Sequence, residues 1–198
     1  MYTKKAIKSA IAGSMDLKMR ILLDEEFLAQ LERAIEVLVD AFRSDKRVYL
    51  CGNGGSAADA QHIAAEFSGR FYLNRKALPA EALHVNTSFL TAVANDYSFA
   101  HAFKRSVEAF GREGDVLIGI STSGNSENVV LAQEEARARG MMVISMTGKT
   151  GGKLRQSAHI LLNVPSTDTP RIQEGHSLLG HIMAENVERI LFGKNKKK

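Results

Sequence analysis

The first part of the chain, from about Lys4 to Arg43, repeats apolar residues every three or four positions. This period places apolar side chains on one face of a helix, so the segment predicts two long helices. The apolar positions are Ile7, Ile11, Met15, Leu22, Phe27, Leu31, Ile35, Leu38 and Phe42. Two such helices carry more apolar surface than one small sheet covers, so we expect part of it to pack against another copy of the chain.

Beyond residue 47 the pattern changes to short apolar runs of strand type that alternate with helical stretches. Strands are predicted over residues 48–51, 81–85, 115–120, 141–146 and 159–164. Helices are predicted from Ser56 onward, over 88–94 and 99–110, from the bend at 121–126 to about Arg139, and over about 172–192, with Pro165 and Pro170 bracketing the loop before the last helix. This alternation predicts an α/β fold, a three-layer sandwich in which helices cover both faces of a central parallel sheet.

Composition narrows the class of protein. The 198 residues, 44% of them hydrophobic, suit a single domain over 1–198. The net charge of +4 equals the lysines of the basic tail 194–198, and no basic stripe with interleaved aromatics argues for nucleic acid. No run reaches the roughly 18 apolar residues of a membrane span, and charged residues interrupt any N-terminal signal. With one cysteine, Cys51, expected as a buried thiol, we expect a cytoplasmic protein with no membrane partner.

The first predicted strand ends in a glycine turn, Gly52-Asn53-Gly54-Gly55, and Ser56 then opens an Ala-rich helix as its predicted N-cap. The amides at a helix N-terminus and the positive end of its dipole favour a phosphate. Glycines let such a ligand approach the backbone closely. This stretch therefore predicts an anion site.

A second polar bend, Ser121-Thr122-Ser123-Gly124-Asn125-Ser126, also follows a predicted strand and opens a helix. Its hydroxyls and amides would converge at the edge where a parallel sheet normally binds its ligand. Serine and threonine are also ordinary capping residues, but two such bends on neighbouring strands favour a phosphorylated small molecule.

Nucleotides fit the two bends less well. Gly52-x-Gly54-x-x-Ala57 matches the dinucleotide fingerprint, which also needs an acidic residue about 20 positions further on. Arg75 and Lys76 occupy that distance. Neither bend continues as the Gly-Lys-Ser/Thr of a P-loop, which argues against ATP.

His62 and Glu66 are four residues apart, so they share one face of the Ala-rich helix predicted from Ser56 onward. The last predicted helix adds the polar residues Gln173, Glu174, His176 and His181. Gln173 and His181 are about 80° apart round that helix and about 12 Å apart along it, so they converge only if both lean inward or the shared point lies between them. Two histidines, a carboxylate and an amide oxygen can hold Zn²⁺. His84, His101 and His159 lack comparable neighbours and are interpreted as structural.

With these residues in place, the chain resembles the SIS (sugar isomerase) domain family and, more closely, the bacterial phosphoheptose isomerases. The stretches that carry the resemblance are CGNGGSAADAQHIAAEF, the AND at Ala94 to Asp96, GDVLIGISTSGNS, MTGKTGG and TPRIQEGH, with His181 after them. The likeness extends from the N-terminal helices to Leu191. STSGNS alone is moderately specific, whereas its combination with His62, Glu66, Gln173 and His181 is strong.

The resemblance implies a SIS domain of flavodoxin-like or Rossmann-like fold, assembled as a homotetramer whose adjacent subunits line the active sites. It implies conversion of sedoheptulose 7-phosphate to D-glycero-D-manno-heptose 7-phosphate, a precursor of lipopolysaccharide and other surface glycans. The implied substrate contacts are Asn53, Gly54, Gly55, Ser56, Glu66, Asn95, Asp96, Ser121, Thr122, Ser123, Ser126 and Gln173. The implied ligands of one Zn²⁺ per subunit are His62, Glu66, Gln173 and His181, and the implied catalytic pair is Glu66 with His181.

Isomerisation through an enediol needs a base near carbon and an acid or base near oxygen, roles that suit Glu66 and His181. A metal would polarise the carbonyl. Some relatives have an Asp directly before the Arg of the RIQ motif, where this chain has Pro170 with Asp168 nearby. The role of that acid therefore stays open.

Two alternatives stay open beside this reading. A non-catalytic SIS protein, such as the phosphoheptose-isomerase-like factor that binds the bacterial replication initiator, would keep the phosphate bends and lose the acid–base pair. The presence of Glu66 and His181 favours the enzyme. The second alternative is an isomerase of the same chemistry that acts on another sugar phosphate. Only a comparison of substrates distinguishes it from a sedoheptulose 7-phosphate isomerase.

Overall fold

The computed structural model describes residues 3–193, so residues 1–2 and the basic tail 194–198 lie outside the described residues. Five strands form one parallel sheet in the order β2-β1-β3-β4-β5. The strands are β1 (Val48–Cys51), β2 (Ala80–Ala82), β3 (Val116–Ser121), β4 (Met142–Thr147) and β5 (Ile160–Asn163). The predicted α/β fold with a central parallel sheet is confirmed.

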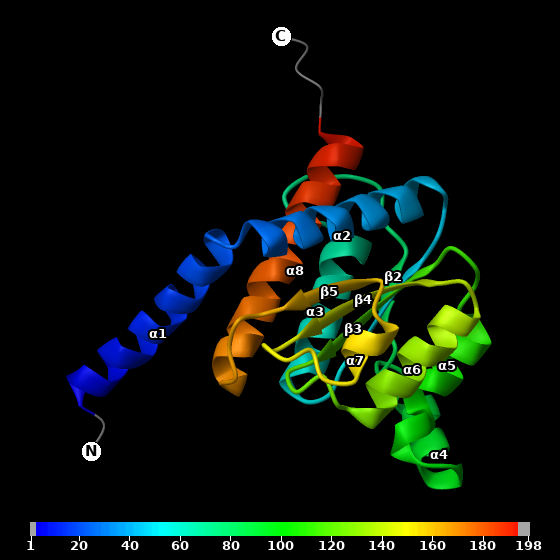
Figure 1. The fold of residues 1–198 in the computed structure, drawn as a ribbon. Coiled ribbons are helices and arrows are strands. Elements are labelled where there is room, and N and C mark those ends of the chain that lie inside the picture. Colours follow the sequence, from blue (N-terminus) through cyan, green and yellow to red (C-terminus); the bar gives the residue numbers. More distant parts are fainter. Residues whose placement is uncertain (1–2, 194–198) are drawn as a thin grey trace.

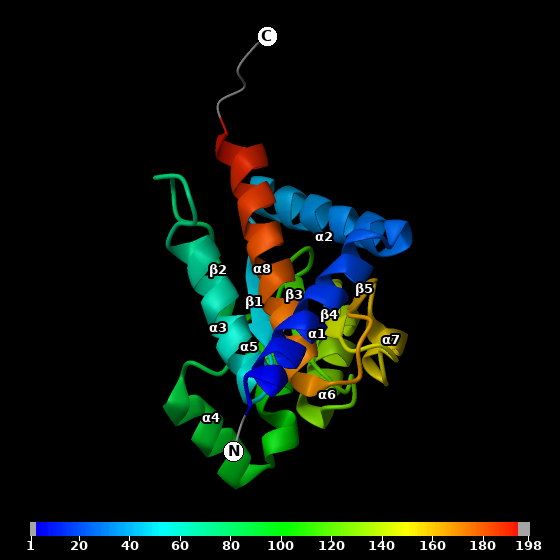
Figure 2. The ribbon, with the colours of Figure 1, turned by 90° about the vertical axis from the view of Figure 1, so that its left-hand side faces the viewer.

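Helices cover both faces of this sheet, with α2, α3 and α8 on one side and α5, α6 and α7 on the other (Figure 1; Figure 2). The helices are α1 (Lys4–Leu22), α2 (Glu25–Arg43), α3 (Gly55–Ser68), α4 (Thr87–Asp96), α5 (Ala102–Phe110), α6 (Glu127–Ala138), α7 (Leu154–Ser157) and α8 (Thr169–Phe192), with a 3-10 turn at Phe99–His101. Neighbouring residues of a strand face opposite sides. Leu50 accordingly belongs to the core with α3 and α8, while Tyr49 and Cys51 belong to the core with α5 and α6.

The two N-terminal helices follow the predicted pattern. Asp24 caps α2 by accepting the backbone N–H of Phe27 at 3.0 Å, which fixes the break between α1 and α2. Helix α2 lies on the sheet, whereas α1 extends away from it and leaves much of its apolar surface exposed (Figure 1). Within residues 3–193, no helix combines the length and the apolar character that a membrane span requires.

Two predicted elements were wrong in their limits. The strand predicted over 81–85 is β2 at Ala80–Ala82, because Asn86 accepts the N–H of Phe89 at 3.0 Å and starts α4 soon after it. The last helix begins at Thr169 instead of about Ile172. Pro170 therefore does not close a loop but occupies the first turn of α8, where its missing N–H costs no helical hydrogen bond.

The strand order creates a switch point beside β1. The chain passes from β1 to β2 on one side of the sheet and continues to β3 on the other side of β1. Parallel sheets bind ligands in the crevice outside the carboxyl ends of the two strands at such a point. The bends after β1 and β3 therefore lie next to each other at the ligand-binding edge.

Candidate active site

The first bend, residues 52–55, joins β1 to α3. Gly54 has a φ of 54°, a left-handed conformation that glycine adopts without strain, and α3 begins at the next residue. The predicted N-cap role of Ser56 is wrong, because Gly54 is the cap and Ser56 lies buried in the first helical turn. No side chain of residues 3–193 caps this end of α3. The amides of Ser56 and Ala57 donate to the carbonyl oxygens of Asn53 and Gly54 at 3.0 and 3.1 Å, and the positive end of the helix dipole at this point favours an anion.

The second bend, residues 121–126, begins at the last residue of β3 and leads into α6, and it brings together the hydroxyls of three serines. The Oγ of Ser121 lies 2.8 Å from that of Ser126 and 3.4 Å from that of Ser123. The N–H of Asn125 donates to Ser123 Oγ at 3.1 Å. Because Ser126 directs its hydroxyl to Ser121, it does not cap α6 with its side chain. The start of α6 thus presents amides and hydroxyls next to the first bend.

A pair of amide side chains ties the two bends together. Asn53 Nδ2 donates to Asn128 Oδ1 at 2.9 Å, and Asn128 Nδ2 donates to Asn53 Oδ1 at 2.8 Å. Asn128 is buried on α6, and its Oδ1 also accepts the N–H of Val129. Sequence reasoning missed Asn128, because nothing in its local pattern distinguishes it from an ordinary helical asparagine.

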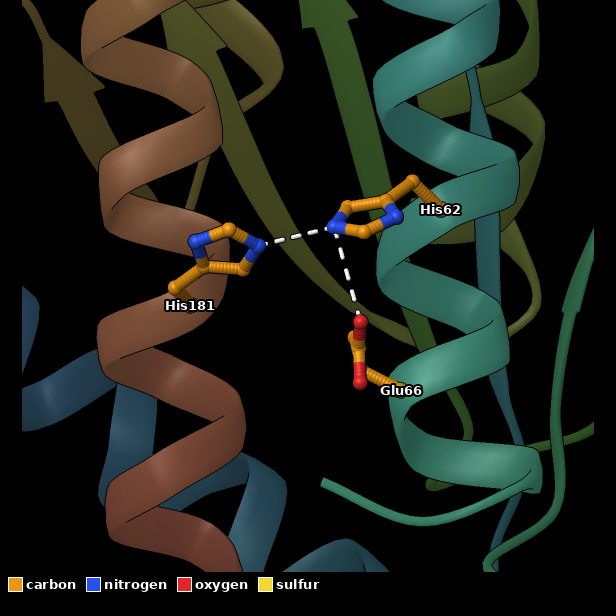
Figure 3. A group of neighbouring side chains, drawn as sticks. All are labelled: His62, Glu66 and His181. Carbon is orange, nitrogen blue, oxygen red and sulfur yellow. Dashed lines mark hydrogen bonds and ion pairs between the residues drawn. The ribbon is translucent and has the colours of Figure 1, made fainter. Parts of the chain in front are cut away.

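His62, Glu66 and His181 converge at a second point, between α3 and α8 (Figure 3). The two Nε2 atoms of His62 and His181 lie 2.7 Å apart, and His62 Nε2 lies 3.5 Å from Glu66 Oε1. One ligand atom from each residue falls within 4.8 Å of the others. Two imidazole nitrogens and a carboxylate oxygen form a donor set that suits Zn²⁺.

Close packing between α3 and α8 sets this geometry. Gly180 precedes His181, and a Cβ built on it would lie 2.5 Å from Cγ1 and Cδ1 of Ile63. Next to this contact, Ser177 Oγ donates to Asp59 Oδ1 at 2.5 Å. Burial raises the pKa of Asp59, while the Ser177 hydrogen bond and positive charge on His62 and His181 counteract it.

Gln173 lies apart from this group. Its amide packs directly over Gly55, where a Cβ would overlap it. Gly55 precedes His62 by seven residues, which is about 10 Å along the helix axis. The structure thus places Gln173 at the first bend, on the predicted substrate side, and its role as a metal ligand stays a prediction.

The remaining predicted contacts are placed as follows. Asn95 and Asp96 form the end of α4 instead of the predicted loop, and Asn95 Nδ2 donates to Asp96 Oδ1 at 2.9 Å. Thr122 and Ser123 line a cavity of about 190 Å³ with Lys149 and hydroxyl residues of the segment before α8. Asp168 occupies the N-cap position of α8, and its Oδ2 lies 4.0 Å from Nε of Arg171.

The other histidines have structural surroundings. His159 Nδ1 accepts the N–H of Val143 at 2.9 Å, and His101 Nδ1 lies 2.9 Å from Ser98 Oγ. Burial lowers the pKa of His84. His176 on α8 is fully buried, and its Nε2 lies 3.1 Å from the carbonyl oxygen of Thr147. Burial lowers the pKa of His176 to about 4, so it stays neutral.

Comparisons of the sequence and of the fold identify known proteins that this chain is similar to. A family model described as a SIS domain matches residues 18–148. The chain is 53% identical to the phosphoheptose isomerase of Clostridium acetobutylicum, over 96% of this chain and 97% of that protein. The solved phosphoheptose isomerase of Neisseria gonorrhoeae superposes with a TM-score of 0.86 at 44% identity, covering 93% of this chain and 98% of that one. For the phosphoheptose isomerase of Francisella tularensis the TM-score is 0.89 at 35% identity, with coverages of 96% and 100%.

Proposed function

This chain belongs to the SIS-domain family and, within it, to the phosphoheptose isomerases, and we propose that it converts sedoheptulose 7-phosphate to D-glycero-D-manno-heptose 7-phosphate. The observation that carries the proposal is the convergence of Glu66 and His181, from two different helices, on one point. A ketose–aldose isomerase requires such a pair, because one proton moves between neighbouring carbons and another between their oxygens.

The two side chains divide the proton transfers. Glu66 removes the proton from the carbon next to the carbonyl and returns it to the other carbon of the enediol. His181 carries the proton between the two oxygens, and it does so only while its Nε2, which faces His62 Nε2 at 2.7 Å, is not bound to the metal.

The two bends hold the phosphate end of the substrate. The positive ends of α3 and α6 face its oxygens, and the hydroxyls of Ser121, Ser123 and Ser126 provide donors. Gln173 stands at the first bend, about 10 Å along α3 from His62, a length that an extended seven-carbon sugar spans. The further substrate contacts that we propose are Asn53, Gly54, Gly55, Ser56, Asn95, Asp96 and Thr122.

We also propose that His62, Glu66 and His181 bind one Zn²⁺ per subunit. Their donor atoms match the three-ligand sets of catalytic zinc sites, which keep a fourth position for water or substrate. Gln173 becomes the fourth ligand only if its side chain leaves Gly55. Bound Zn²⁺ supplies a Lewis acid for the substrate carbonyl. Metal analysis of protein purified without chelators tests this assignment, and a metal content far below one per subunit contradicts it.

The exposed face of α1 supports a homo-oligomer. Ile7, Ile11, Met15 and Met19 recur at every fourth position and are each more than half exposed. A continuous apolar stripe of this kind marks an interaction surface. We propose a homotetramer that buries it and in which adjacent subunits line each active site. Sedimentation is expected to give a tetrameric mass that Met15→Lys lowers, and a monomeric mass of the native protein contradicts the proposal.

The product and the substrate class suggest the cellular role. Heptose 7-phosphate supplies precursors of lipopolysaccharide and other surface glycans. Phosphorylated sugars are cytoplasmic metabolites, so we propose a cytoplasmic enzyme.

Activity measurements on purified protein test the proposal. Sedoheptulose 7-phosphate is expected to yield the aldose phosphate, and Glu66→Gln and His181→Ala are each expected to lower kcat at least about a hundredfold. Both variants should still bind the substrate in calorimetry, because the two bends are unchanged. Glu32→Gln, on the exposed face of α2, is the control.

Each other outcome has a definite meaning. Near-normal rates in either variant refute the acid–base assignment. Faster turnover of a different sugar phosphate favours the isomerase of another substrate. No turnover of any ketose or aldose phosphate by the metal-loaded protein favours a non-catalytic binding protein.

A further inference from the structure

A buried ion pair holds the segment after α3 against α8. Arg75 Nε donates to Glu188 Oε1 at 3.0 Å, and each side chain is only 2% exposed. Glu188 also accepts the backbone N–H groups of Phe71, Tyr72 and Leu73 at 3.0, 2.7 and 2.8 Å. Burial raises the pKa of Glu188, but these donors outweigh it and leave the pKa below its ordinary value. The carboxylate is therefore ionised and fully used within the fold.

The other nitrogens of Arg75 bind the end of α3. Nη2 donates to the carbonyl oxygen of Glu66 at 2.8 Å, and Nη1 donates to those of Phe67 and Gly69 at 2.7 and 3.2 Å. The last four carbonyls of a helix lack partners within the helix, and a cation at this end also suits the helix dipole. Arg75 thus stabilises the last turn of α3 by binding its backbone.

This turn is the one that carries Glu66. Helix α3 ends at Ser68, and terminal turns fray unless something holds them. On the other side of the ion pair, Glu188 follows His181 by seven residues, about two turns of α8. The pair therefore connects the backbone of Glu66 directly to the helix of His181. Phe71, which donates to Glu188, also places its ring 5.7 Å from the ring of His181.

We propose that Arg75 and Glu188 are positioning residues that hold Glu66 and His181 at the separation required for metal binding and proton transfer. The inference rests on the proposed function only for its catalytic part, since the metal-binding part concerns geometry alone. Neither residue reaches the substrate in this account. A planar guanidinium is required because one side chain serves a carboxylate and several carbonyls in different directions, which a lysine ammonium does not match.

Two variants test the inference, Arg75→Lys and Glu188→Gln, with Asp115→Asn as the matched control. Asp115 is also a buried carboxylate that accepts two backbone N–H groups, from Arg47 and Arg112, both at 2.9 Å. It directly precedes β3, at the end of the strand opposite the bend at Ser121. All three variants are expected to melt at lower temperature than the native protein, so they are compared well below the lowest Tm, where circular dichroism shows each one folded.

The measured quantities are Zn²⁺ affinity, by competition with a chromogenic chelator, and kcat and KM for sedoheptulose 7-phosphate. Arg75→Lys and Glu188→Gln are expected to weaken Zn²⁺ binding about 10- to 100-fold, the range for partners that orient metal ligands. Their kcat should fall at least about tenfold while KM changes little, because the phosphate bends are distant from the pair. Asp115→Asn should keep native values of both.

Wild-type Zn²⁺ affinity in folded Arg75→Lys and Glu188→Gln overturns the inference, and so does an equal loss in Asp115→Asn. If the native protein shows no isomerase activity, the proposed function fails. The chelator competition then still decides whether the ion pair positions the metal ligands.

Discussion

Replacing Gly180 by alanine tests whether the close approach of α3 and α8 brings together His62, Glu66 and His181, the proposed metal and acid–base site. The added Cβ would lie 2.5 Å from Cγ1 and Cδ1 of Ile63, about 1 Å inside normal contact. Ile63 is completely buried, so its side chain has no solvent space to enter. The expected result is that α8 moves away from α3 and that the nitrogens of His62 and His181 separate.

The magnitude follows from two opposing terms. Overpacking of this kind costs about 1–3 kcal/mol, whereas Gly→Ala within a helix gains up to about 1 kcal/mol. Gly13→Ala isolates the second term, because Gly13 lies within α1 and a Cβ there meets nothing within 4 Å. Gly180→Ala should therefore be about 1–3 kcal/mol less stable than Gly13→Ala in urea unfolding at one fixed protein concentration.

A double variant tests the same contact from the other side. Ile63→Ala alone should cost about 2–5 kcal/mol through the cavity it leaves. In the double variant the methyl added at position 180 partly fills that cavity, so this variant should be at least about 1 kcal/mol more stable than the sum of the single effects. Zn²⁺ affinity should fall about tenfold in Gly180→Ala. Equal stability of Gly180→Ala and Gly13→Ala, together with native Zn²⁺ affinity, would refute the reasoning.

Two further predictions concern buried polar groups. Because the pKa of His176 is about 4 in the fold and near 6.5 when unfolded, only the unfolded chain gains this proton between those values, so stability should fall by about 3 kcal/mol from pH 6.5 to pH 4. His176→Gln keeps an N–H for the Thr147 carbonyl and should lose that part of the pH dependence in urea unfolding; an unchanged pH profile contradicts the assignment. Asn128→Ala removes the partner of Asn53, so KM for sedoheptulose 7-phosphate should rise about tenfold at nearly constant kcat, the effect of about 1.4 kcal/mol. An unchanged KM in steady-state assays would show that the first bend needs no such support.

Much of the fold follows from local patterns. The period of apolar residues over 4–43 is enough to predict α1 and α2, and the buried runs at 48–51, 115–120 and 141–146 are enough to predict β1, β3 and β4. Boundaries were less predictable where a short signal competed with a stronger neighbour. Asn86 caps the start of α4, and this early helix start shortens β2. Pro170 was interpreted as part of a loop because proline breaks helices, although proline also suits the first turn of a helix such as α8.

For the candidate site, the sequence by itself determined which groups are present and their spacing within one element. His62 and Glu66 share a face of α3 because they are four residues apart, and the glycine and serine bends after strands predict anion sites through local backbone geometry. These statements depend only on neighbours along the chain.

Tertiary structure alone decided which distant groups meet. The strand order places the bend of β1 beside that of β3, which allows Asn53 to pair with Asn128. The packing of α8 on α3 brings His181 to His62, and it leaves the side chain of Gln173 over Gly55 at the first bend. Such partners are separated by long stretches of chain, and their meeting depends on how whole helices and strands pack, a property that no local sequence pattern contains.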